Sequence, residues 1–98
     1  MTKELLSELL NVNIDQMDID EDEIDYAMTW KYSDTISVYK VSHLLKKHIL
    51  KKFRTVLWTC LDSGGDYNCR INSLAKEEFY AKTELEAIYK AYVWLSQT

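Results

Sequence analysis

Hydrophobic residues near the start of the chain recur at the spacing of an amphipathic helix. Four leucines share one arc of a helical wheel, with polar residues opposite them: Leu5, Leu6, Leu9 and Leu10. Thr2 stands just before them and is a favourable N-cap residue. The pattern predicts a first helix over residues 2–11.

Two further helices are predicted before residue 53. Asp20 is a favourable N-cap followed by three acids that suit the positive end of a helix dipole, so a short helix is expected to about Trp30. A longer helix is expected to begin at Ser33 or Asp34 and to end near Lys52. Its buried stripe consists of four apolar residues: Val38, Val41, Leu45 and Ile49.

The pattern then changes to the two-residue alternation of β-strands. Residues 53–61 are rich in β-branched and aromatic side chains and predict a strand. Gly64 and Gly65 predict a tight two-residue hairpin turn, and 67–74 is the return strand. Residues 76–81 predict a third, shorter strand, although their composition also suits a helix.

Thr83 and Glu86 form a capping box that predicts a last helix to about Ser96. The order is three helices, two or three antiparallel strands and a helix. This is an α+β fold in which helices cover the sheet. The 98 residues predict a single domain, with residues 1–22 as a helix plus an acidic loop and 23–98 as the core.

Charge is strongly segregated along the chain. The net charge is −4, but residues 1–27 carry −8 and residues 31–54 carry +6. A mean charge therefore says little about the partner. The sequence shows neither a membrane-length apolar run nor a signal peptide, so a cytoplasmic location is expected.

No motif of a known catalytic or metal site occurs in the sequence. G-x-S-x-G, a phosphate-binding loop, H-E-x-x-H and C-x-x-C are all missing. His43 and His48 are five residues apart, so they diverge on a helix and cannot chelate one ion. We therefore expect a protein that is not an enzyme and uses neither a cofactor nor a metal.

The two cysteines allow two interpretations. If Gly64 and Gly65 are the central turn residues, Cys60 lies directly opposite Cys69, at a non-hydrogen-bonded position where a disulfide would fit. A reducing cytosol favours two packed thiols instead. A bulge of one residue would abolish the pairing.

The first candidate binding surface is acidic. Seven carboxylates fall within residues 15–25. The predicted contact residues for a partner with a basic surface are Asp18, Asp20, Glu21, Asp22, Glu23, Asp25 and Tyr26. The alternative is that these acids only cap a solvated helix.

The second candidate surface lies on the long helix, opposite its buried stripe. Apolar and aromatic groups fringed by lysines suit a nucleic-acid backbone or an acidic protein surface. Its residues are Ile36, Tyr39, Lys40, His43, Lys46 and Lys47. The alternative is that the leucine helix 2–11 covers this face. The last helix has a wide apolar arc, which makes homodimerisation a further possibility.

Residues from about Glu23 onward resemble the phage ABA sandwich domain, a family of small bacteriophage proteins. The resemblance rests on Ala27 to Trp30 with Tyr32-Ser33-Asp34, Ile36 and Val41, Gly64-Gly65, and Phe79-Tyr80-Ala81 with Thr83, Ala87 and Ala91. The first 22 residues have no counterpart in the family, and Lys82-Thr83 stands where the family often has proline. The resemblance covers about three quarters of the chain.

The resemblance implies an α/β/α layered fold and a phage origin, but the family has no well-established activity. It implies a phage accessory protein that works in the infected bacterial cytoplasm and binds and inhibits a host protein, in the manner of an anti-CRISPR. Two alternatives remain open from the residues. One is a nucleic-acid-binding module that uses the basic helix 40–54, although overall acidity counts against direct nucleic-acid binding. The other is a homo-oligomeric structural protein.

Overall fold

The computed structural model describes residues 1–29, 36–71 and 77–97. Its elements in chain order are α1 (Lys3–Leu10), the 3-10 turn η1 (Ile14–Gln16), α2 (Glu21–Thr29), α3 (Val38–Phe53), β1 (Leu57–Leu61), β2 (Tyr67–Ile71), β3 (Glu78–Ala81) and α4 (Glu84–Ser96). The strands form one antiparallel sheet in the order β1-β2-β3. The predicted α+β class and element order are confirmed, and the third strand is present.

The helix starts follow local capping signals. Each predicted cap accepts a backbone N–H three residues further on, at 3.0 to 3.1 Å: Thr2, Asp20 and Thr83. Thr83 also donates its hydroxyl hydrogen to the carbonyl oxygen of Met28. Thr83 therefore accepts a hydrogen bond from a free N–H group at the start of α4 and also links this helix to the end of α2.

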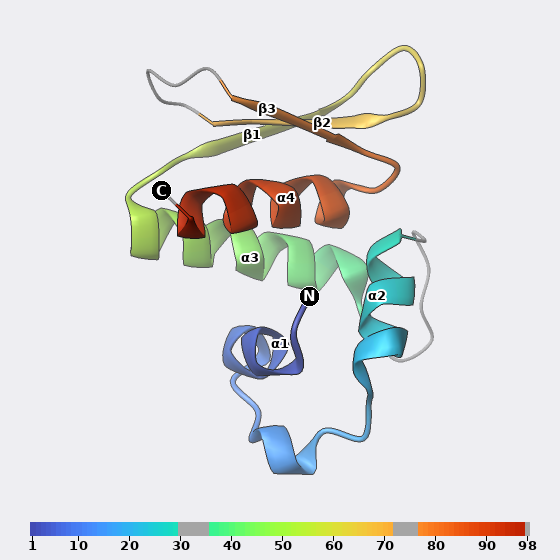
Figure 1. Cartoon of the computed structure of the whole chain (residues 1–98), viewed down its shortest axis with the longest axis vertical. Coiled ribbons are helices and arrows are strands. Elements are labelled where there is room, and N and C mark those ends of the chain that lie inside the picture. The colour runs from blue at the N-terminus through green and yellow to red at the C-terminus, as the bar shows by residue number, and fades with distance from the viewer. Residues whose placement is uncertain (30–35, 72–76, 98) are drawn as a thin grey trace.

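The helices are stacked beneath the sheet (Figure 1). α4 packs directly on the inner face of the sheet and also against α3, and α1 packs on α3 from the other side. The central core residues are 0 to 2% exposed: Leu6, Ile24, Val41, Leu45, Ile49, Cys69 and Ile88. α4 is thus enclosed by the sheet on one side and by helices on the other, which accounts for its wide apolar arc.

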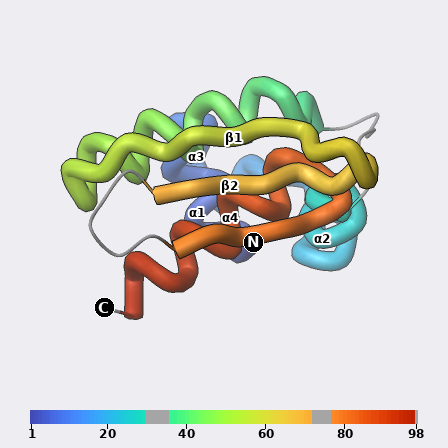
Figure 2. Tube along the Cα trace, turned by 90° about the horizontal axis from the view of Figure 1, so that it is seen from above, coloured from blue at the N-terminus to red at the C-terminus, as the bar shows by residue number. Residues whose placement is uncertain are grey.

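The outer face of the sheet is uncovered among the described residues. Figure 2 looks down on this face and shows the strands in front of all the helices. Trp58 is 62% exposed there and Tyr80 48%. The fold therefore differs from the α/β/α layering that the phage resemblance implies, because every described helix lies on the same side of the sheet.

Two predicted boundaries are wrong around α3. The helix begins at Val38 rather than at Ser33 or Asp34, because the side chain of Ser37 caps it by accepting the N–H of Lys40. Ser33 and Asp34 themselves lie outside the described residues. At the other end the helix continues through Phe53, so the strand starts at Leu57 and not at residue 53.

The predicted hairpin register is wrong by one residue. The turn is a five-residue loop in which the Asp62 carboxylate accepts the N–H groups of Gly64 and Asp66 at 2.9 and 3.0 Å. Cys60 therefore faces Asn68, and Cys69 faces Thr59. Because neighbouring side chains alternate between the two faces of a sheet, Cys60 is exposed and Cys69 is buried, and both are free thiols. The suggested disulfide is excluded.

Candidate functional site

The acidic segment lies on the surface at the start of α2. Its side chains from Asp18 to Asp25 are exposed, apart from Ile19 and Ile24. Asp20 caps the helix, and Glu21 accepts the backbone N–H of Lys3 at 3.4 Å. Asp25 pairs with the ammonium group of Met1 at 3.0 Å. Tyr26, the adjoining aromatic residue, is 59% exposed.

None of the described lysines forms an ion pair with this segment. Four ion pairs join described residues, and the N-terminal ammonium group makes the one that reaches residues 18–25. Lys46 pairs with Glu84 and Lys82 with Asp66, both far from α2 in the sequence. Within residues 1–29, 36–71 and 77–97, the acidic segment is thus paired with one cation, the N-terminal ammonium group.

A shallow apolar groove of about 350 Å³ adjoins the acidic segment. It lies between α1, the residues before α2 and the start of α3. Its lining is Leu6, Leu10, Met17, Asp18, Ile19, Ile36, Ser37, Lys40 and Val41. The fold thus brings together Asp18 from the first predicted surface with Ile36 and Lys40 from the second. The periodicity of apolar residues in the sequence did not predict this groove, because its walls come from three separate segments of the chain.

The predicted basic surface on the long helix is divided by the fold. Ile36 is 7% exposed and packs in the core, whereas Tyr39 is 76% exposed. Lys40 and His43 are also exposed. Lys46 faces the sheet, where its ammonium group donates a hydrogen bond to the hydroxyl oxygen of Thr59 at 2.7 Å. The predicted set is therefore not one continuous surface.

A second groove, of about 750 Å³, lies between α1 and the C-terminal half of α3. Its lining is Glu8, Leu9, Leu44, Lys47, His48, Leu50, Lys51 and Arg54. Of these, Lys47 belongs to the second predicted surface, and Lys51 and Arg54 belong to the basic helix 40–54 of the nucleic-acid alternative. The leucine helix docks on α3, but it leaves this groove open beside it. It does not cover the second predicted surface, because Tyr39 is 76% exposed and His43 is exposed. The four-residue spacing of Lys47 and Lys51 was a signal for a shared face.

The thiol of Cys60 is exposed, whereas the thiol of Cys69 is buried. Burial raises the pKa of Cys69 from 9.0 to about 12, while the nearby positive charge of Lys46 acts in the opposite direction. A thiol with this pKa is protonated near neutral pH and is a poor nucleophile. Cys69 therefore serves as a packed core residue.

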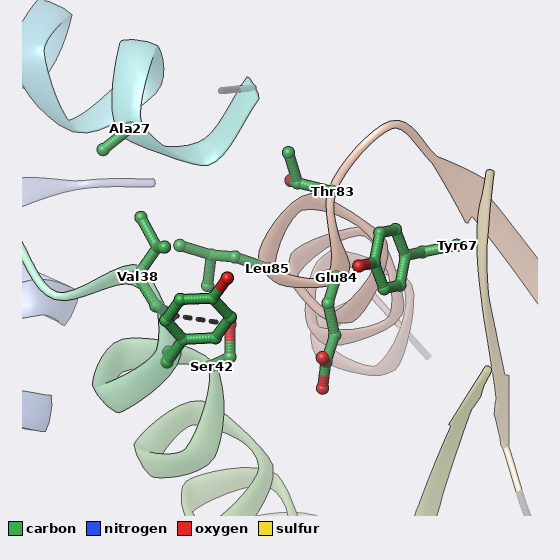
Figure 3. Close-up of a pocket in the computed structure, with 8 residues that line it drawn as sticks. Ala27, Val38, Ser42, Tyr67, Thr83, Glu84 and Leu85 are labelled. Atoms are coloured by element: carbon green, nitrogen blue, oxygen red, sulfur yellow. Dashed lines mark hydrogen bonds between the residues drawn. The ribbon is translucent and has the colours of Figure 1, made fainter. Parts of the chain in front are cut away.

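A small cavity lies where α2, α3, β2 and the start of α4 meet (Figure 3). Its volume is about 30 Å³, which is room for a water-sized molecule and too little for a substrate. Figure 3 shows Ala27 on one side and Tyr67 and Glu84 on the other. Within the described ranges, no group of three or more His, Cys, Asp or Glu side chains is placed to hold a metal ion. No described helix is long and apolar enough to cross a membrane.

Comparison of the chain with protein-family models, curated proteins and solved structures found no match in any of the three. The resemblance to the phage family therefore stays a prediction, and the functional argument rests on the residues of this chain.

Proposed function

We propose that the protein is a non-enzymatic accessory protein that binds a partner protein through its acidic face and thereby inhibits it. The acidic face consists of Asp18, Asp20, Glu21, Asp22, Glu23, Asp25 and Tyr26. The observation that supports this proposal is the exposure of six carboxylates with one ion pair, to the N-terminal ammonium group, among the described residues. Such a density of like charge repels itself unless a cationic surface receives it.

The surroundings of these carboxylates suit a protein partner. Tyr26 adds an exposed aromatic ring, a residue type enriched among side chains that dominate binding energy. The groove beside Asp18 has an apolar floor that could receive an apolar side chain of the partner. An acidic rim next to an apolar groove resembles the composition of a protein interface more than that of a nucleic-acid site.

The proposed partner is a protein with a basic, nucleic-acid-binding surface. Carboxylates displayed along α2 would compete there with the phosphates that such a surface normally binds. In the phage setting that the resemblance implies, this partner is a host defence protein, and the inhibitor works by occupying its nucleic-acid path.

Two triple variants with equal charge test the proposal. The first changes the first turn of α2 by Glu21→Gln, Asp22→Asn and Glu23→Gln. The matched control changes exposed acids outside residues 15–25 by Glu4→Gln, Glu8→Gln and Glu78→Gln. Both variants move the formal net charge from −4 to −1.

We expect the immobilised wild-type and control chains to retain the same bacterial protein, and the α2 triple to lose it. The retained protein, once purified, should release bound DNA or RNA when wild-type chain is added but not when the α2 triple is added. Equal retention by both triples, or undisturbed nucleic-acid binding by the partner, would refute the proposal.

A further inference from the structure

The groove between α1 and α3 carries a positive charge that the rest of the described chain leaves unpaired. Lys47, Lys51 and Arg54 line it. None of the four ion pairs between described residues includes any of these three cations. Among the described lining residues, Glu8 is the one acid against three cations, which gives these side chains a net positive charge.

The floor of the same groove is apolar. Leu9 and Leu44 are partly or fully buried beneath it, and Leu50 is 48% exposed. His48 also lines it, and its buried Nε2 nitrogen has no hydrogen-bond partner within the described parts of the chain. An apolar floor with a cationic rim is complementary to a ligand that combines apolar and anionic groups.

We propose that this groove binds an acidic amphipathic helix of another protein, a site separate from the acidic face on α2. Such a helix places apolar side chains at i, i+3 or i+4, and i+7 on the floor, and flanking carboxylates beside the three cations. The α3 part of the lining runs from Leu44 to Arg54, which corresponds to about 15 Å of helix, or about three turns of a bound partner.

The composition favours a peptide over nucleic acid. The described lining offers leucines where a single strand would need aromatic rings on which to stack its bases. Protein–DNA interfaces are also more polar than a floor of three leucines. The net charge of −4 adds repulsion against a polyanion, whereas a short peptide with a few carboxylates suffers less of it.

The test uses the full chain and a fluorescent acidic peptide of about 12 residues, with leucines at helical spacing and glutamates beside them. A scrambled peptide of the same composition and a single-stranded DNA are the comparison ligands. The protein variants are Lys47→Glu with Lys51→Glu, and a matched control that is Lys40→Glu with Lys82→Glu. Fluorescence anisotropy is measured at about 50 mM and about 200 mM salt.

We expect saturable binding of the amphipathic peptide, at least about tenfold weaker for the Lys47/Lys51 variant and nearly unchanged for the control. The scrambled peptide should bind about tenfold more weakly, because it cannot present its leucines on one face. Circular dichroism of both variants checks that they are folded. Absence of saturable peptide binding, an equal loss in the control, or tighter binding of the DNA would each overturn the proposal. Because the α2 acids are unchanged throughout, none of these results bears on the proposed function.

Discussion

The two sides of α3 carry similar side chains but use them differently. On the side that faces the sheet, Lys46 is held between Thr59 and Glu84, at 2.7 and 2.9 Å, and so links α3 to β1 and α4. On the side that faces α1, Lys47 lines an open groove and forms no ion pair among the described residues. Two adjacent lysines thus have different roles, one in the fold and one available for binding.

The difference shows that charge alone does not identify a binding residue. A helix turns by about 100° per residue, so Lys46 and Lys47 point in different directions. Which of them is committed to the fold depends on Glu84, which comes from a helix much later in the chain. The same reasoning distinguishes the apolar residues on the two sides, and the predictions below test it.

The largest effect is expected from the comparison of a buried leucine of α3 with an exposed one. Leu45→Ala should cost about 2–5 kcal/mol of unfolding free energy, because Leu45 is fully buried and its loss leaves a cavity. Leu50→Ala should cost less than about 1 kcal/mol, because Leu50 is 48% exposed in the groove floor. Urea denaturation of both variants measures the difference. Similar losses would mean that the groove floor is part of the core.

A pH effect of intermediate size is expected from Cys69. This residue of β2 is fully buried, and its thiol lies near Lys46 of α3. Its folded pKa of about 12 lies above the ordinary thiol pKa of 9.0, so its contribution to stability is complete below pH 9 and is lost as pH rises toward 12. Between pH 9 and pH 10.5 this group should remove about 2 kcal/mol of stability.

Two cysteine variants isolate this effect from the titration of lysines and tyrosines. Urea denaturation at several alkaline pH values should show a shallower loss of stability in Cys69→Ala than in wild type. Cys60→Ala keeps the buried thiol and should follow the wild-type profile. Parallel profiles for Cys69→Ala and wild type would show that the thiol is accessible to water in the fold.

The sequence predicted the features that depend on local interactions. Thr2, Asp20 and Thr83 each cap the helix that follows them, because the capping hydrogen bond spans three residues and needs no distant partner. The buried stripe that includes Val41, Leu45 and Ile49 was also visible, because a helix side that faces a core must repeat at helical spacing.

The sequence did not predict the features that depend on a loop conformation or on docking. The hairpin register depends on the Asp62 carboxylate, which holds a five-residue loop where two glycines suggested a two-residue turn. A shift of one residue exchanged the faces on which Cys60 and Cys69 lie. The groove between α1 and α3 depends on how these two helices pack against each other. The periodicity of apolar residues within either helix carries no information about that packing.

The smallest effect is expected from the two lysines themselves. Lys46→Met should cost about 1 kcal/mol, because it leaves Thr59 and Glu84 without their cation in a half-buried site, where each charged side chain is about one third exposed. Lys47→Met should change stability by less than about 0.5 kcal/mol, since Lys47 has no ion pair to lose among the described residues.

A double-mutant cycle with Glu84→Gln separates the ion pair from other effects of removing a charge. Lys46→Met and Glu84→Gln should be non-additive by about 0.5–1 kcal/mol, because either change alone already breaks the Lys46–Glu84 contact. Lys47→Met and Glu84→Gln should be additive, because Lys47 points about 100° away from Lys46 and forms no ion pair with Glu84. If the free-energy changes of Lys47→Met and Glu84→Gln are as non-additive as those of Lys46→Met and Glu84→Gln, the coupling comes from the summed charge of the basic helix and not from the ion pair. The two sides of α3 would then not be distinct.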